Sequence, residues 1–193
     1  MEEIIFATKN QGKFTYYRER FQEYGVRLSH VEMDLPEPRS DDLTEIAKEK
    51  VLYAYNSLKK PCIAVDAGFY INSLNGFPRA FVNFTLSTIG IEGILRLAEG
   101  KPRECEFRNC IAYMDNTLDK PVFFEAGIRG YLSESKRGKL SPIDWSELSL
   151  IFIPEGTYKT LGEMTRDERS NLLSQRWGAS YREVAEWLAN RKN

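Results

Sequence analysis

The chain has 193 residues, of which 42% are hydrophobic and 28% are charged. This length predicts a single domain, 1–193, that could be built as two closely joined lobes, and the composition excludes collagen, a coiled coil and a disordered tail. No apolar run approaches the ~18 residues that span a bilayer, so we expect no membrane segment. Twenty-seven basic and 28 acidic residues give a net charge of −1, which argues against nucleic-acid binding but is compatible with a small charged ligand.

The cysteines and the single histidine narrow the chemistry further. Cys62, Cys105 and Cys110 are an odd number without a C-x-x-C pair, which favours buried thiols in a reducing compartment. With His30 as the only histidine, Ser-His-Asp, Cys-His and multi-histidine metal chemistry are disfavoured. The strand-like run Ile4–Ala7 lacks the basic region and long apolar core of a signal peptide, so we expect a cytoplasmic protein.

The first half of the chain is predicted to alternate strands and helices. Short apolar runs between polar turns indicate strands, and apolar residues at helical spacing indicate helices. Asp42, followed three positions later by Glu45, has the pattern of a capping box. The predicted elements are the strand Ile4–Ala7, the helix Phe14–Tyr24, the strand Val26–Met33, the loop Leu35–Ser40, the helix from Asp42 to Leu58, and the strands Cys62–Val65 and Phe69–Leu74.

In the second half, two long strands are expected to pair as an antiparallel hairpin across the turn Asp115–Thr117. Thr165 with Glu168 has the pattern of another capping box. Early alternation of strands and helices followed by a hairpin predicts an α/β fold with a mixed sheet. The elements are the helix Ile91–Ala98, the strands Cys105–Tyr113, Val122–Tyr131 and Leu148–Ile153, a helix that Thr165 opens, and the helix Tyr181–Leu188.

The first candidate site is the pattern Thr8-x-Asn10-x-x-Lys13, in the turn between the first strand and the first helix. Unpaired backbone N–H groups and the helix dipole make such a turn suitable for phosphate. Asn10 can donate and accept hydrogen bonds, and Lys13 adds a positive charge. The alternative is an ordinary helix cap without a ligand.

The second candidate is the pair of acids Glu37 and Asp66. Pro36 and Pro38 stiffen the loop around Glu37, and Asp66 follows the apolar run Cys62–Val65 at a predicted break between two strands. A carboxylate there is costly without a partner, and Mg²⁺ bound by one or two carboxylates together with substrate phosphates would provide one. Alternatively, Glu37 is a solvated loop acid and Asp66 caps a turn.

The third candidate is the segment Ser174-Gln175-Arg176, near the end of the helix that Thr165 opens. The guanidinium of Arg176 could contact a phosphate or a base carbonyl in a forked geometry. An arginine near a helix end is otherwise an ordinary surface residue.

Six short motifs follow one another from the N-terminus to the last third of the chain. They are Ala7–Lys13, Pro36–Pro38, Asp66–Gly68, Leu74–Pro78, Phe152–Glu155 and Glu163–Met164. In order and spacing they resemble those of the inosine triphosphate pyrophosphatase family, over almost the whole chain, and the segment Gly90–Gly100 is similar to archaeal members. The resemblance implies a long mixed sheet flanked by helices, two lobes with a central cleft, and a homodimer.

The resemblance also implies an activity and a set of roles. Family members hydrolyse ITP, dITP and XTP to the monophosphate and pyrophosphate with magnesium. By resemblance, Thr8, Asn10 and Lys13 would bind the triphosphate. Glu37 would bind magnesium, and Asp66 would bind magnesium and activate water at the α-phosphorus. Ser174 and Arg176, in Ser174-Gln175-Arg176, are what remains of a Ser-His-Arg substrate-binding signature.

Several positions depart from the family pattern. Val65 stands where a second acid adjoins Asp66, and Arg79 stands where the pattern has a glycine. Glu147-Leu148-Ser149 replaces a Gly-Tyr-Asp element of the base pocket. A phosphate-contacting helix lysine aligns with Leu52, with Lys48 and Lys50 within about a turn, and Asp41 and Asp42 are acids that could compensate for Val65.

These departures leave three hypotheses. The first is a magnesium-dependent nucleoside triphosphate pyrophosphatase with altered base preference or reduced activity. The second is a catalytically silent relative that binds a nucleotide or a partner, for which Val65 argues. The third, a nucleic-acid binder, has little support from the charge balance.

Overall fold

A computed structural model describes residues 3–141, 144, 146–176 and 178–191. Within them, seven strands form one mixed sheet in the order β2-β1-β3-β5-β6-β7, with β4 paired to β3. The predicted α/β class with a mixed sheet is therefore confirmed. The strands are β1 (Glu3–Ala7), β2 (Arg27–Val31), β3 (Cys62–Ile71), β4 (Pro78–Arg79), β5 (Glu104–Met114), β6 (Val122–Leu132) and β7 (Phe152–Pro154).

The helices lie close to the predicted ranges, with one addition, the short helix α3. They are α1 (Gln11–Glu23), α2 (Leu43–Leu58), α3 (Val82–Thr88), α4 (Gly90–Leu97), α5 (Arg166–Arg176) and α6 (Gly178–Asn190). None of the helices in the described ranges is both long and apolar enough to cross a membrane.

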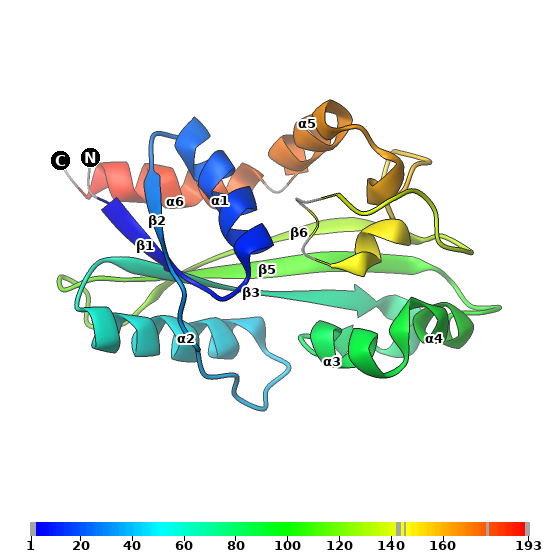
Figure 1. The fold of residues 1–193 in the computed structure, drawn as a ribbon, viewed down its shortest axis with the longest axis horizontal. Coiled ribbons are helices and arrows are strands. Elements are labelled where there is room, and N and C mark those ends of the chain that lie inside the picture. The colour runs from blue at the N-terminus through cyan, green and yellow to red at the C-terminus, as the bar shows by residue number, and fades with distance from the viewer. Residues whose placement is uncertain (1–2, 142–143, 145, 177, 192–193) are drawn as a thin grey trace. The chain divides into compact units, whose positions relative to one another are not determined.

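The chain divides into two compact units. The first comprises Met1–Asp66, Asn109–Ala126 and Trp177–Asn193, and the second comprises Ala67–Arg108 and Gly127–Arg176. In the first unit, α1 and α6 pack together on one face of the strands, and α2 lies on the opposite face (Figure 1). The second unit contains α3, α4 and α5.

Parallel pairing in the first unit directs the ends of two strands to the same edge. β1 pairs in parallel with β2 on one side and with β3 on the other, and on the β3 side Ile5 lies opposite Cys62 and Phe6 opposite Ile63. Because parallel strands run in one direction, this register carries the turn after β1 toward the middle of β3. The carboxyl ends of such strands are where α/β proteins commonly bind ligands.

The core of the first unit is rich in aromatic side chains. Tyr17 is fully buried, with its ring edge-on to Phe6 at 5.5 Å and to Tyr181 of α6 at 5.4 Å. Its hydroxyl accepts a hydrogen bond from Asn109 Nδ2 at 2.9 Å. Fully burying one large apolar side chain stabilises a fold by ~1.5–3 kcal/mol, so this packing holds α1, and the turn before it, against the sheet.

The capping signals in the sequence are realised in full at α5 and in part at α2. At α2 the Thr44 N–H donates to Asp42 Oδ1 at 2.8 Å, so Asp42 caps the helix. The predicted return bond from Glu45 is wrong, because the Asp42 N–H donates to Ser40 Oγ at 3.1 Å and Glu45 Oε2 accepts from the Ser40 hydroxyl at 2.6 Å. At α5 both bonds of the predicted capping box are present: the Thr165 N–H donates to Glu168 Oε2 at 2.8 Å, and the Glu168 N–H donates to Thr165 Oγ1 at 3.2 Å. Each satisfies a backbone donor that the helix itself leaves unpaired.

The predicted break in the chain at Asp66 is wrong. β3 runs without interruption through Cys62–Ile71, and Asp66 lies in its middle, so the alternative in which Asp66 caps a turn is wrong as well. Gly68 does not end the strand but leaves room for β4. A Cβ at position 68 would lie 2.7 Å from the carbonyl oxygen of Arg79 on β4. Glycine at this position permits the close approach of a neighbouring backbone.

The strand predicted at Leu148–Ile153 is also wrong in its first half. Glu147–Leu150 forms a 3₁₀ helix, and the strand β7 is confined to Phe152–Pro154. Ser146 explains the difference, because its Oγ accepts a hydrogen bond from the Leu148 N–H at 3.2 Å and so caps the helical turn.

The predicted burial of the three cysteines is confirmed. Cys62, Cys105 and Cys110 are free thiols, and all are buried. Burial raises the pKa of the Cys62 thiol to about 12 and that of the Cys110 thiol to about 12. Thiols held so far from ionisation are poor nucleophiles, so these cysteines serve the core.

Candidate active site

The turn after β1 forms the cap of α1. The Asn10 N–H donates to Thr8 Oγ1 at 3.1 Å, and the Lys13 N–H donates to Asn10 Oδ1 at 2.9 Å. Asn10 therefore performs the ordinary capping role that was one of the two alternatives for it. The cap and the phosphate site are compatible, because Asn10 is exposed and Thr8 half-buried at the amino-terminal end of a 13-residue helix.

His30 of β2 holds this turn from the side. Its Nε2 lies 2.8 Å from the carbonyl oxygen of Thr8, and its ring stacks on Phe14 with centroids 4.5 Å apart. The single histidine thus supports the backbone of the turn.

A cluster of charged side chains lies next to this turn, in the same unit. The ammonium of Lys50, on α2, donates to Asp66 Oδ1 of β3 at 2.6 Å and lies 3.3 Å from Glu37 Oε1. Lys50 and Asp66 are buried, whereas the Glu37 side chain is 75% exposed. Lys50 therefore bridges a buried acid and an acid at the solvent-facing side of the cluster.

Lys13 faces the same cluster. Burial lowers the pKa of the Lys13 ammonium, the negative charge of Asp66 acts to raise it, the positive charge of Lys50 lowers it, and Glu37 raises it; the net effect is a lowered pKa. These electrostatic contacts bring together four residues from a helix start, a loop, a second helix and a strand. The sequence prediction that Lys13, Glu37 and Asp66 meet at one place is consistent with this arrangement.

The cluster is balanced in charge. The two ammonium groups of Lys13 and Lys50 oppose the two carboxylates of Glu37 and Asp66. A buried carboxylate such as Asp66 is tolerated only with a partner, because removing an ion from water is expensive. The site thus has both positive groups for phosphate and oxygen ligands for a hard cation.

The two carboxylates fit a magnesium ion that is shared with a substrate. In the described residues no group of three or more histidine, cysteine or acidic side chains is placed to hold a metal ion. Magnesium is commonly bound by one or two carboxylates, with phosphate oxygens and water completing its coordination. Glu37 and Asp66 supply that number.

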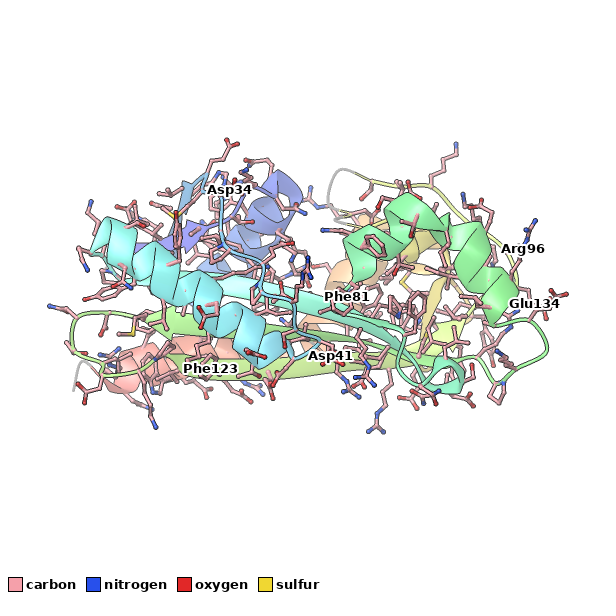
Figure 2. The ribbon with its side chains drawn as sticks, turned by 90° about the horizontal axis from the view of Figure 1, so that it is seen from below. Asp34, Asp41, Phe81, Arg96, Phe123 and Glu134 are labelled. Carbon is pink, nitrogen blue, oxygen red and sulfur yellow. The ribbon has the colours of Figure 1, made fainter. Side chains whose placement is uncertain are left out.

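Position 65 and the acids of the neighbouring loop add no clear third ligand. Val65 is buried and apolar. The Asp42 carboxylate caps α2, as described above, and Asp41 is exposed on the connection between β2 and α2 (Figure 2). The suggestion that Asp41 or Asp42 compensates for Val65 therefore gains no support.

Lys50 is the residue that the sequence prediction left out of the site. The family's helix lysine was aligned with Leu52, but Leu52 is half-buried and apolar, Lys48 is exposed, and Lys50 points into the cluster. A signal was present: Lys50 lies on the apolar face of α2, four residues from both Ile46 and Ala54. A lysine on such a face is rarely buried without an acid.

The remaining positions singled out from the sequence are Ser174, Arg176 and Arg79. Ser174 and Arg176 belong to the last turn of α5, and their side chains are outside the described part of the structure. Arg79 is exposed, with φ at 55°, and its Nη2 donates to the carbonyl oxygen of Asn75 at 3.1 Å, so its guanidinium folds over its own turn.

The second unit holds a separate buried ion pair. Asp144 pairs with Arg169 Nη2 and accepts a hydrogen bond from Ser149 Oγ at 2.6 Å. Burial raises the pKa of the Asp144 carboxyl, but Arg169 and Ser149 lower it by more, so the net shift is downward. Ser149, at the position expected in the base pocket, therefore has its hydroxyl engaged within the protein.

Known proteins resemble this chain over almost its whole length. A model of the Ham1 family matches residues 4–187. A dITP/XTP pyrophosphatase of Methanopyrus kandleri is 38% identical over 188 residues, covering 97% of this chain and 96% of the relative. A dITP/XTP pyrophosphatase of Saccharolobus solfataricus is 34% identical, with 96% and 93% covered.

Solved structures show the same fold. A HAM1 protein from Coxiella burnetii superposes with a TM-score of 0.81 at 22% identity, covering 98% of this chain and 100% of that one. The Staphylococcus aureus Ham1 protein gives 0.79 at 20% identity, with the same coverage. The resemblance drawn from the short motifs is confirmed, including its archaeal character.

Proposed function

This chain belongs to the Ham1 family, and we propose that it hydrolyses non-canonical purine nucleoside triphosphates, such as ITP, dITP and XTP, to the monophosphate and pyrophosphate. The observation that carries the proposal is the cluster of Lys13, Lys50 and Asp66 beside the start of α1. It combines positive groups for a chain of phosphates with a carboxylate placed to accept a proton.

In this proposal the start of α1 binds the triphosphate. The helix dipole, with Thr8 and Asn10 in the turn, receives phosphate oxygens, and Lys13 and Lys50 neutralise their charge. Asp66 accepts a proton from the water whose oxygen attacks the α-phosphorus. The bond between the α-phosphorus and the bridging oxygen then breaks, and pyrophosphate leaves.

Glu37 and Asp66 would hold magnesium. When bound, magnesium supplies neutralisation of phosphate charge and a lower pKa for a coordinated water. Ser174 and Arg176 would make further contacts with the substrate. Family membership also suggests that the protein forms a homodimer and is located in the cytoplasm.

Base preference is expected to differ from that of relatives with the Gly-Tyr-Asp element. Here Glu147–Leu150 is a 3₁₀ helix, and Ser149 is hydrogen-bonded to Asp144. A second candidate function, nucleotide binding without turnover, is favoured by one observation: Val65 is a buried apolar residue where a second acid would adjoin Asp66.

A pyrophosphate-release screen separates the two functions. We expect release from ITP, dITP or XTP with magnesium, and little from the common triphosphates. The change Asp66→Asn should lower turnover ~10²–10⁴-fold, the usual contribution of a general base, while nucleotide binding persists. Asp34→Asn is the matched control, because Asp34 is an exposed acid paired with Lys9.

Two outcomes would contradict the proposal. Turnover that survives Asp66→Asn at the wild-type rate would remove the assigned role of Asp66. Nucleotide binding without release of pyrophosphate from any triphosphate, with or without magnesium, would favour the silent binding module instead.

A further inference from the structure

The ammonium of Lys50 occupies the position between the two carboxylates assigned to the metal. It lies 2.6 Å from Asp66 Oδ1 and 3.3 Å from Glu37 Oε1. At these distances the Lys50 ammonium forms ion pairs with both carboxylates. A metal ion bound by the same two acids would therefore compete with Lys50 for the same oxygen atoms. The competition follows from the positions of these atoms.

Lys50 cannot leave this position without a replacement. Asp66 is buried in the middle of β3, and an unpaired buried carboxylate is strongly destabilising. A second cation must therefore arrive as Lys50 departs. The long, flexible lysine stem allows its ammonium to move while the helix backbone stays in place.

The charges of the cluster determine when the exchange of Lys50 for a metal ion is favourable. Lys13, Lys50, Glu37 and Asp66 together sum to zero. Adding a divalent cation alone would leave two uncompensated positive charges in a partly buried site, where charges of like sign repel strongly. Adding the metal with a polyphosphate supplies negative charge for the ammonium groups of both Lys13 and Lys50.

We propose that Lys50 is an internal counter-cation that occupies the metal-binding carboxylates until a metal-polyphosphate complex arrives, and then transfers to the phosphates. This inference rests on the proposed function and adds a binding order to it. Metal and nucleotide bind together, and each raises the affinity of the site for the other. Such coupling is reciprocal by thermodynamic necessity.

The proposal is tested by metal binding rather than by activity. Free Mn²⁺, followed by its electron paramagnetic resonance signal, is titrated into the full chain with and without an α,β-imido analogue of ITP, which cannot be cleaved at that bond. For the wild type we expect weak binding of Mn²⁺ alone and an affinity at least ~10-fold higher with the analogue, about 1.4 kcal/mol of coupling.

Removing the counter-cation should release the carboxylates. Lys50→Met should bind Mn²⁺ alone at least ~10-fold more tightly than the wild type, and the analogue should add less. Lys48→Met is the matched control on the same helix, because Lys48 is exposed, and it should behave as the wild type. Should Lys50→Met fail to fold, which circular dichroism reports, Lys50→Gln supplies the same comparison with an amide donor retained toward Asp66.

The possible outcomes distinguish a failure of the counter-cation proposal from a failure of the proposed pyrophosphatase function. Equal Mn²⁺ affinity in the wild type and in a folded Lys50 variant, in a protein that binds the analogue and releases pyrophosphate, overturns the counter-cation alone. Failure of the wild type to bind the analogue at all overturns the proposed function, and the counter-cation with it.

Discussion

Asp115 holds the carboxyl-terminal helix to the sheet through one carboxylate. Arg191 Nη1 lies 2.8 Å from Asp115 Oδ2 and Nη2 lies 3.2 Å from Oδ1, so the contact is a two-pronged ion pair. Tyr113 and Thr117 donate further hydrogen bonds to the same carboxylate, at 2.8 Å and 2.9 Å. Asp115 is buried, which limits screening by solvent.

The contribution of this ion pair to stability can be derived from the shift in the pKa of Asp115. Burial raises the pKa of Asp115, but the hydrogen bonds from Arg191, Thr117 and Tyr113 outweigh it and lower the pKa to about 2. Relative to the ordinary value of 3.8, and at ~1.4 kcal/mol per pKa unit, the ionised carboxylate contributes about 2.5 kcal/mol at pH 7.

The sign of the pH dependence is set by the direction of the shift. Because the folded pKa is below the unfolded one, the contribution is complete above about pH 5 and declines as the pH falls through 3.8 toward 2. About half of it should be lost at pH 3. Asp115→Asn removes the charge and nearly keeps the shape, so it should remove this pH-dependent part of the stability.

Urea unfolding at several pH values provides the assay. At pH 7 we expect Asp115→Asn to lower the free energy of unfolding by about 2 kcal/mol, and the difference from the wild type to fall to about half at pH 3. Asp119→Asn is the control, because Asp119 is exposed and, like Asp115, follows β5. It should change the free energy of unfolding by less than ~0.5 kcal/mol. A difference of the same size at pH 7 and pH 3, or none at pH 7, would refute the reasoning.

Two further substitutions test backbone features of the fold by the same urea unfolding. Gly68→Ala places a Cβ 2.7 Å from the Arg79 carbonyl oxygen and 2.9 Å from Tyr70 Cε2, so it should destabilise the protein by ~1–3 kcal/mol; an unchanged midpoint would show that β4 yields without cost. Thr165→Ala removes the side-chain acceptor of the α5 capping box and should cost ~1 kcal/mol, whereas Thr165→Ser keeps that acceptor and should cost little; equal losses in the two variants would contradict the cap.

Features with local causes were predictable from the sequence. Asp42 and Leu58 were placed at the two ends of α2, and Thr165 at the start of α5, because capping and helical spacing involve residues within a turn of one another. The same holds for β1 and for the turn that follows it. Strand partners lie far apart in sequence, so the register of β1 against β3 had no comparable signal.

The predicted break at Asp66 failed because of a contact with a distant segment, whereas the strand predicted at Leu148–Ile153 failed because of the local cap from Ser146. Asp66-Ala67-Gly68 looked like a break because glycine commonly ends strands, yet Gly68 is required by the approach of the Arg79 backbone. The motif order, in contrast, pointed to the correct family because each motif is short and local. The same motifs did not identify Lys50, which lies on α2 outside all six of them.

The ion pair of Lys50 with Asp66 could have been predicted from the sequence. A charge interrupts an apolar pattern at Lys50, on the buried face of α2, and at Asp66, within the apolar run of β3. Either charge alone would make folding costly, and together they are neutral. Lys50 and Asp66 are therefore candidates for one ion pair, and their 2.6 Å contact satisfies that expectation. A charged residue on an apolar face is thus best interpreted together with the nearest unmatched opposite charge, because the cost of burial requires both.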